Sequence, residues 1–262
     1  MVAAFSLVFF LVLMLVGFYT YAQTETGGSA EFRYTFENSS YFNGMTFAIY
    51  AFYFAFLLLL PIFVATEGGA QIAGETASGT LFLLLTRPIS RARIFFTKLA
   101  IGGLFAGTLT GGFLAGALLI GLVAVGWGDL DLYPGVLQMA ESHQHIPQST
   151  AILRFLIAWP AASLALCVPL ALSFLISSWV DRPVNATGTS VALYLVMHVI
   201  SSIHFFRDLR PFLFTSYMSY WRGLFREDVD WAAMGADAAK LAGFGLLFVA
   251  TAFHRFRVRE EA

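Results

Sequence analysis

Hydrophobic residues gather into six long runs that are separated by shorter polar segments. The runs cover about residues 2–22, 45–66, 94–127, 151–179, 184–206 and 232–253. A run of about 18 or more apolar residues indicates a transmembrane helix, because about 20 helical residues cross the hydrocarbon core of a bilayer. The pattern therefore predicts an all-α integral membrane protein, a six-transmembrane-helix bundle that forms a single domain over residues 1–262.

The composition supports this interpretation. Charged residues make up 12% of the chain, about half of the roughly 25% that is usual in soluble domains. The first run lacks the positively charged leader of a signal peptide, so we expect an uncleaved span. Cys167 is the only cysteine, which excludes a disulfide within the chain. We predict a multi-pass protein of the cell membrane (inner or plasma membrane).

Between the second and third runs, residues 67–98 carry charges at both ends and in the middle. Small and apolar residues recur there at helical spacing, at Ala70, Ala73, Ala77, Leu81 and Leu84. This spacing predicts a short amphipathic helix over about residues 70–86 that lies at the membrane edge and does not cross it. Pro88 disfavours helical geometry at the preceding Arg87 and should end this helix, and Ser90 is suited to cap the next one.

The arginines that follow indicate an orientation. Arg91 and Arg93 fall in the first turn of the next helix, where the helix dipole disfavours each cation by up to about 1 kcal/mol. Anionic lipid, the positive-inside bias or an acidic partner must therefore favour them. Basic residues are more frequent on the side of residues 67–98 and acidic residues on the other side, so we expect this stretch to be cytoplasmic.

Glycines in the third run lie four residues apart, at Gly103, Gly107 and Gly111. Such spacing lets two helix backbones approach closely. Two interpretations stay open, which are packing within the bundle and contact between two subunits.

Polar side chains follow one line of the fifth run. They are Thr187, Ser190, Tyr194, His198 and Ser201. A polar line on a span usually faces the bundle interior or an aqueous cavity, so these residues either line a conduit or form hydrogen bonds between helices. For His198, a core histidine is the default interpretation and a proton carrier is the alternative.

Two segments between runs carry further candidates. Residues 128–150 are predicted to form a polar loop. Within it, His143 and His145 are weak candidates for a metal site, because two histidines alone are a poor ligand set. Residues 207–231 combine an apolar, aromatic face with Arg210, Arg222 and Arg226 around it, which is typical of an interfacial or re-entrant amphipathic helix.

No pattern of catalytic chemistry is present. The chain has no G-x-x-x-x-G-K-[ST] phosphate loop, no H-E-x-x-H and no G-x-S-x-G. We therefore expect a chain that is not an enzyme and that binds no cofactor itself.

The stretch after the second run resembles a known family. The segments IAGE at residues 72–75, GTL at 79–81 and LLTRPISR at 84–91, followed by Ile94 and Lys98, are similar to the signature of ABC-2-type transporter permeases. These permeases are the membrane subunits of ATP-binding-cassette exporters. The segment LFTS at 213–216, with Trp221, and the basic tail after the last run add to the resemblance.

The resemblance implies that residues 70–86 form a cytoplasmic coupling helix, between spans two and three, that docks on a separate ATPase subunit holding ATP and Mg. The residues at or near that contact would be Glu75, Gly79, Thr80, Leu81, Arg87, Pro88 and Arg91. The residues lining the substrate path would be Tyr50, Tyr53, Thr187, Tyr194, His198 and Ser201. The re-entrant segment between spans five and six would close the outer side.

The resemblance also implies a complex within the lipid bilayer. Two permease subunits, identical or different, would pair with two ATPases; a periplasmic partner is possible and no nucleic acid is expected. Two other functions stay open, an ion-coupled secondary transporter or channel that uses His198, and a membrane-anchored metal-binding subunit that uses His143 and His145. The sequence does not name the substrate.

Overall fold

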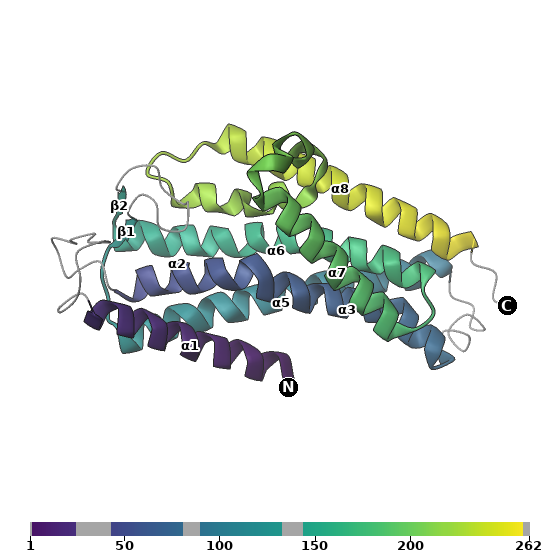
Figure 1. The fold of residues 1–262 in the computed structure, drawn as a ribbon, viewed down its shortest axis with the longest axis horizontal. Helices are drawn as coiled ribbons and strands as arrows, with labels where there is room; N and C mark the ends of the chain where they lie inside the picture. Colours follow the sequence, from purple (N-terminus) through teal and green to yellow (C-terminus); the bar gives the residue numbers. More distant parts are fainter. Residues whose placement is uncertain (1, 25–42, 81–89, 133–143, 259–262) are drawn as a thin grey trace. The chain divides into compact units, whose positions relative to one another are not determined.

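The computed structural model describes residues 2–24, 43–80, 90–132 and 144–258, and these are almost entirely helical (Figure 1). The α-helices are α1 (Val2–Thr24), α2 (Gly44–Phe54), α3 (Leu60–Ala77), α5 (Arg91–Ala124), α6 (Gln148–Trp179), α7 (Pro183–Ser202) and α8 (Trp231–Val258). A π-helical turn, η2 (Ala55–Leu59), joins α2 to α3, and three 3₁₀ segments, η3 (His204–Phe212), η4 (Phe214–Ser216) and η5 (Met218–Phe225), follow α7. Two strands, β1 (Leu130–Leu132) and β2 (Gln144–Ile146), lie before α6.

Five helical stretches in this part of the chain are long and apolar enough to cross a membrane. They are Gly44–Ala77, Arg91–Ala124, Gln148–Trp179, Pro183–Ser202 and Trp231–Val258. They confirm an all-helical, multi-pass membrane protein and coincide with the second to sixth predicted spans. Helix α1 covers the first predicted run, but it is not among these five stretches, so a sixth span stays a prediction.

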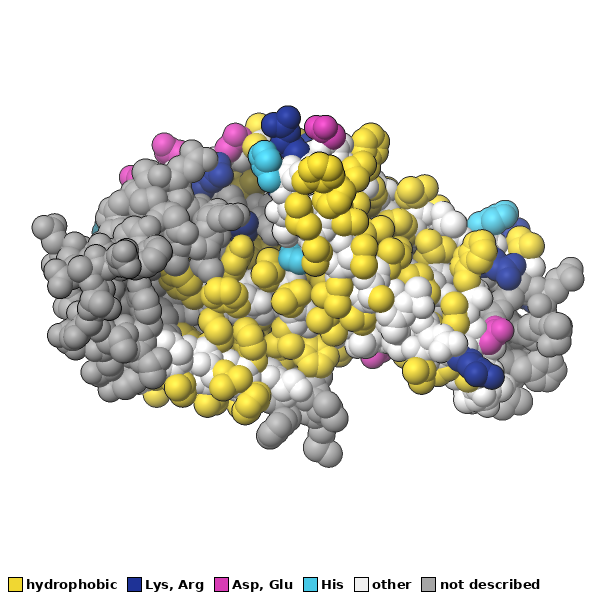
Figure 2. All heavy atoms as spheres, viewed as in Figure 1, with side chains coloured by type: hydrophobic (Ala, Val, Ile, Leu, Met, Phe, Trp, Pro, Cys, Tyr) yellow, Lys and Arg dark blue, Asp and Glu magenta, His cyan; other side chains and the backbone are white. Residues whose placement is uncertain are grey.

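The surface of these helices is also that of a membrane protein. Large apolar side chains such as Val123, Val184 and Leu246 are exposed along the spans. The face shown in Figure 2 is mostly hydrophobic, with few charged side chains among the apolar ones. Surfaces of this kind are expected to lie against lipid, because soluble proteins rarely expose such extended apolar area.

The chain forms two compact units. The first comprises Met1–Phe56, Gly111–Trp159 and Arg222–Val229, and the second comprises Leu57–Thr110, Pro160–Trp221 and Asp230–Ala262. In the first unit, Asn43 caps α2 by accepting a hydrogen bond from the Thr46 amide at 3.0 Å, and its side-chain amide donates to the Asp129 carbonyl at 2.6 Å. Gly111 of α5 lies so close to α6 that a Cβ would stand 2.6 Å from the Trp159 ring. At this glycine, packing within the chain is the correct interpretation.

The prediction of a plain polar loop over residues 128–150 is wrong at its ends. Strands β1 and β2 pair antiparallel, with Leu130 opposite Ile146 and Asp131 opposite His145. Leu130, Leu132 and Ile146 are buried, so apolar burial holds the pair together. Three-residue strands are too short for alternation to be visible in the sequence, and α6 also begins three residues earlier than predicted, at Gln148.

The segment after α7 differs from the single amphipathic helix that was predicted. Helix α7 ends at Ser202, since Ile203 adopts extended dihedral angles (φ −80°, ψ 129°), and three short 3₁₀ segments follow. Pro211 cannot donate a backbone hydrogen bond, and Leu213 is again extended, so a continuous helix is interrupted twice. Trp221 is fully buried, whereas Leu209 is about half exposed.

The core of the second unit is built from four helices. Its buried apolar cluster comprises Ile72 of α3, Ile94 and Phe95 of α5, Phe174 of α6, and Ala252 and Phe256 of α8. The rings of Phe95 and Phe174 meet edge to face, with centroids 5.2 Å apart. Such aromatic pairs add about 0.5–1.5 kcal/mol to the burial of their surface. This cluster fixes the last turns of α3 against the first turns of α5.

Candidate functional site

The predicted coupling helix does not begin as a separate element near residue 70. Helix α3 is continuous from Leu60 to Ala77, so residues 70–77 are the last two turns of the stretch that starts at Gly44. The predicted second span ended near residue 66, and Gly68 and Gly69 follow it. The glycines allow close packing, since a Cβ on Gly69 would lie 2.8 Å from the Thr187 Cα of α7. Tertiary contact here outweighs the low helix propensity of glycine.

Helix α3 ends in a glycine turn. The Ser78 amide donates to the Gly74 carbonyl at 3.1 Å, and the Gly79 amide donates to the Thr76 carbonyl at 3.1 Å. Gly79 has φ +71°, the left-handed conformation that commonly ends a helix and that favours glycine. Of the predicted contact residues, Gly79 and Thr80 lie in this turn, while Leu81, Arg87 and Pro88 lie outside the described residues.

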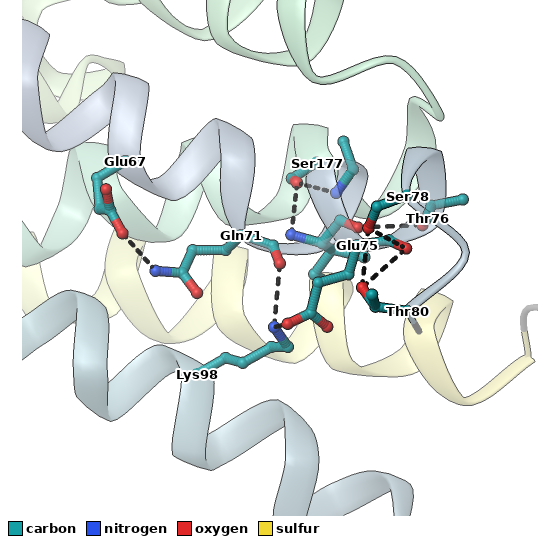
Figure 3. A network of polar contacts seen from close by, with 10 residues as sticks. Glu67, Gln71, Glu75, Thr76, Ser78, Thr80, Lys98 and Ser177 are labelled. Atoms are coloured by element: carbon teal, nitrogen blue, oxygen red, sulfur yellow. Dashed lines mark hydrogen bonds and ion pairs between the residues drawn. The ribbon is translucent and has the colours of Figure 1, made fainter. Parts of the chain in front are cut away.

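An ion pair holds the end of α3 to α5. Lys98 Nζ lies 2.5 Å from Glu75 Oε1 and donates to the Gln71 carbonyl at 3.1 Å (Figure 3). The lysine side chain is 11% exposed and the glutamate side chain 30% exposed. Among the described residues, Glu75 Oε2 has no hydrogen-bond partner. One carboxylate oxygen is therefore paired with α5, and the other is buried without a hydrogen-bond partner among the described residues.

A serine of α6 joins α3 on the same turns. Ser177 Oγ accepts from the amides of Ile72 at 3.1 Å and Ala73 at 2.9 Å, and it comes from a separate helix, as Figure 3 shows. Sequence reasoning missed Ser177, because a serine in a span usually bonds its own helix and gives no signal of a partner. It also missed the role of Lys98, although a lone lysine inside an apolar run calls for a partner.

The start of α5 follows the sequence prediction. Ser90 Oγ accepts from the Arg93 amide at 3.3 Å, which confirms Ser90 as the cap. Arg91 Nη1 donates to the Arg257 carbonyl in the last turn of α8 at 3.4 Å. The carbonyl end of a helix favours a cation, so α8 offsets the unfavourable place of Arg91 at the amide end of α5.

One residue of the polar line on α7, Tyr194, forms a hydrogen bond to the η2 turn. Tyr194 is buried, its hydroxyl donates to the Leu57 carbonyl at 2.8 Å, and its ring stacks on His198 with centroids 5.8 Å apart. Pro61, four residues after Leu57, has no amide hydrogen, so this carbonyl lacks its α-helical donor. The tyrosine hydroxyl supplies that donor from α7.

The other path candidates have separate surroundings. Thr187 Oγ1 bonds the carbonyls of its own helix, and Ser201 Oγ accepts from Thr215 Oγ1 at 3.1 Å. In the first unit, Tyr50 is buried, and the Arg222 guanidinium lies 5.1 Å from the centre of the Tyr53 ring. The structure thus brings Tyr194 and His198 together, and the role of all six residues as a path stays a prediction.

One of the metal candidates, His145, belongs to the β1–β2 pair. His145 Nδ1 lies 2.8 Å from Asp131 Oδ1, and this hydrogen bond raises the pKa of His145 above its usual value. No group of three histidine, cysteine or acidic side chains within the described ranges is suited to hold a metal ion. His143 lies outside those ranges.

These observations define a class of protein, namely a helical, multi-pass integral membrane protein with five candidate spans in the part of the chain that the structure describes. Comparison with protein families identifies the family. Residues 1–207 of the 262 match the family described as ABC-2 family transporter protein. The chain therefore belongs to the ABC-2 transporter family, whose members are typically non-catalytic membrane subunits. The resemblance found in the sequence is confirmed. No curated protein matches the chain.

Proposed function

We propose that the chain is the permease subunit of an ABC exporter, which forms the substrate path and is driven by a separate ATPase subunit that binds ATP and Mg. One observation supports this proposal most. Helix α3 continues a candidate span to Ala77, ends in the turn at Gly79, and is tied to α5 through Lys98 and to α6 through Ser177.

This arrangement is suited to transmit a movement from a partner subunit to the spans. A displacement of the Gly79 turn by a partner would move the last turns of α3 as one hydrogen-bonded rod. The Glu75–Lys98 pair would pass the movement to α5, and the amides bound by Ser177 would pass it to α6. Hydrolysis in the ATPase would then bias the spans between two discrete arrangements, as transport requires.

The remaining parts have roles in the same scheme. Two permease subunits with two ATPases would enclose the path in the cell membrane, lined by Tyr50 and Tyr53 and by the polar line on α7. The 3₁₀ segments between α7 and α8 would close the outer side.

The test is association with the ATPase. Glu75→Lys and Arg91→Glu alter the end of α3 and the start of α5, and we expect both to lose co-purification with a Walker-motif subunit and stimulation of its ATPase. Lys240→Glu, on α8, is a control that should retain both. Unchanged association and stimulation in the two variants would contradict the proposal.

A topology measurement is independent of any partner. In a Cys167→Ser background, Ser78→Cys adds one thiol next to the Gly79 turn, where the serine is exposed. A membrane-impermeant maleimide should label it only when the cytoplasmic side is opened to the reagent. Labelling from the outside of intact cells would remove the basis of the coupling scheme.

A further inference from the structure

The second unit contains an apolar cavity of about 380 Å³ between α5, α6, α8 and η5. Residues that line it include Leu99 and Gly103 of α5, Leu164 and Cys167 of α6, and Ala238 and Leu246 of α8. The proposed coupling site uses none of these residues.

The chemistry of the lining excludes polar occupants. Besides backbone, it offers the thiol of Cys167 and the hydroxyl of Tyr220, and this hydroxyl already donates to the Ala161 carbonyl at 2.8 Å. A buried water needs two to four polar partners, and a polar solute would lose its hydration without compensation. Neither water nor a polar substrate therefore suits this cavity.

The cavity opens on the surface that the spans expose. Leu164 and Leu246 both line it, and these side chains are 65% and 71% exposed. Small residues, including Gly103 and Ala238, create its depth, and a Cβ added at Gly103 would meet nothing within 4 Å. In a membrane, the material outside such leucines is bilayer hydrocarbon.

The dimensions fit one hydrocarbon chain. On α8 the lining runs from Ala238 to Val249, or about 16 Å at 1.5 Å per residue, roughly half of a hydrocarbon core of about 30 Å. An apolar cavity of about 150 Å³ holds one benzene molecule of six carbons, so the volume of this cavity corresponds to roughly 15 carbons, which is about one acyl chain and too little for a whole phospholipid. An empty cavity of this size would forfeit dispersion contacts along all of its walls.

From this lining and opening, we infer that the cavity is a binding site for one acyl chain of a bilayer phospholipid, which contacts Cys167 at its wall. The inference is independent of the proposed function, because it depends only on the spans and the lipid around them.

Photochemical labelling tests it directly. The full chain is reconstituted in phosphatidylcholine that carries a diazirine in the middle of one acyl chain, irradiated, and mapped by mass spectrometry. We expect adducts on Cys167. Ala238→Phe fills the cavity and should lower that adduct by about tenfold, the change in occupancy expected for excluding about two methylene groups. The adjacent Ala239 is exposed and does not line the cavity, so Ala239→Phe should leave the adduct unchanged.

Three results would overturn the inference. Adducts on outward residues such as Leu247 with none on Cys167 would show an unoccupied cavity. An equal Cys167 adduct in Ala238→Phe would show labelling from elsewhere. Cross-linking of Cys167 between two copies by a bis-maleimide, without lipid adducts, would show a second subunit in place of lipid. If Ala238→Phe does not fold, Gly103→Leu fills the same space from α5.

Discussion

Replacing Lys98 by methionine tests the contact that ties α3 to α5. The change keeps the length of the side chain and removes its charge, so Nζ no longer contacts Glu75 Oε1 at 2.5 Å or the Gln71 carbonyl at 3.1 Å. Exposed ion pairs contribute about 0–1 kcal/mol, and removing one partner of a buried pair costs about 3–5 kcal/mol. With side chains 11% and 30% exposed, we expect an intermediate loss, about 2 kcal/mol.

The assay is a double-mutant cycle on the purified chain in detergent. Lys98→Met, Glu75→Gln and the double variant are compared by thermal unfolding, where about 2 kcal/mol corresponds to a decrease in Tm of roughly 4–8 °C. Because each single change leaves a partly buried group without its partner, the double variant should lose less stability than the sum of the two.

Lys240→Met provides the matched control. Lys240 pairs with Asp237 at 3.1 Å and lies 4.8 Å from the centre of the Tyr217 ring, but both side chains of the ion pair are 40% or more exposed, so its loss should cost about 1 kcal/mol or less. Equal decreases in Tm for the two lysine variants would refute the reasoning, as would strict additivity in the cycle.

Three further changes have defined outcomes. Tyr194→Phe should lower stability by about 1–2 kcal/mol, because it leaves the Leu57 carbonyl without a donor, and thermal unfolding would show this. Gly69→Ala should reduce the yield of folded protein on size exclusion, since its Cβ would lie 2.8 Å from the backbone of α7. Hydrogen exchange of the β1–β2 amides should increase as the pH rises above about 6.5, the pKa of an unperturbed histidine. Folding raises the pKa of His145, so its contact with Asp131 stabilises the strand pair fully below the pKa of the unfolded chain. This stabilisation is lost as the pH rises through the higher pKa of the folded protein.

Each of these changes has a control. Gly74→Ala places a methyl group where nothing lies within 4 Å and should preserve folding, which separates crowding from altered helix propensity. Met197→Leu, on α7 three residues after Tyr194, should leave stability nearly unchanged. His145→Gln should remove the pH dependence of exchange after correction for intrinsic rates. A pH dependence that persists in this variant would assign it to another group.

Sequence reasoning succeeded where one physical signal dominates. The apolar runs placed α5, α6, α7 and α8 to within a few residues at most ends, because a span needs about 20 apolar residues whatever its neighbours are. The cap at Ser90 was also predictable, since its interaction with the Arg93 amide is local. The segments within residues 72–91 indicated the family, and the match over residues 1–207 confirms the family assignment.

It failed where contacts between distant residues decide the structure. Residues 67–69 contain a charge and two glycines, and glycine has a low helix propensity. Helix α3 nevertheless continues through them, because those glycines fit against neighbouring helices. The pairing of Leu130 with Ile146 joins residues far apart in sequence. The bond from Ser177 to the amides of α3 spans about a hundred residues, and no periodicity in either segment indicates it.

The π-helical turn at Ala55–Leu59 sets the rotation of α3 about its own axis relative to α2. Such a turn carries one residue more than an α-helical turn, and each residue of an α-helix advances it by about 100°. Deleting a single residue from this turn would leave both flanking helices intact but change by that angle the rotation of α3 about its axis relative to α2. One surplus residue, about sixteen positions before Glu75, therefore decides which side-chain face of α3 continues which face of α2 along this stretch.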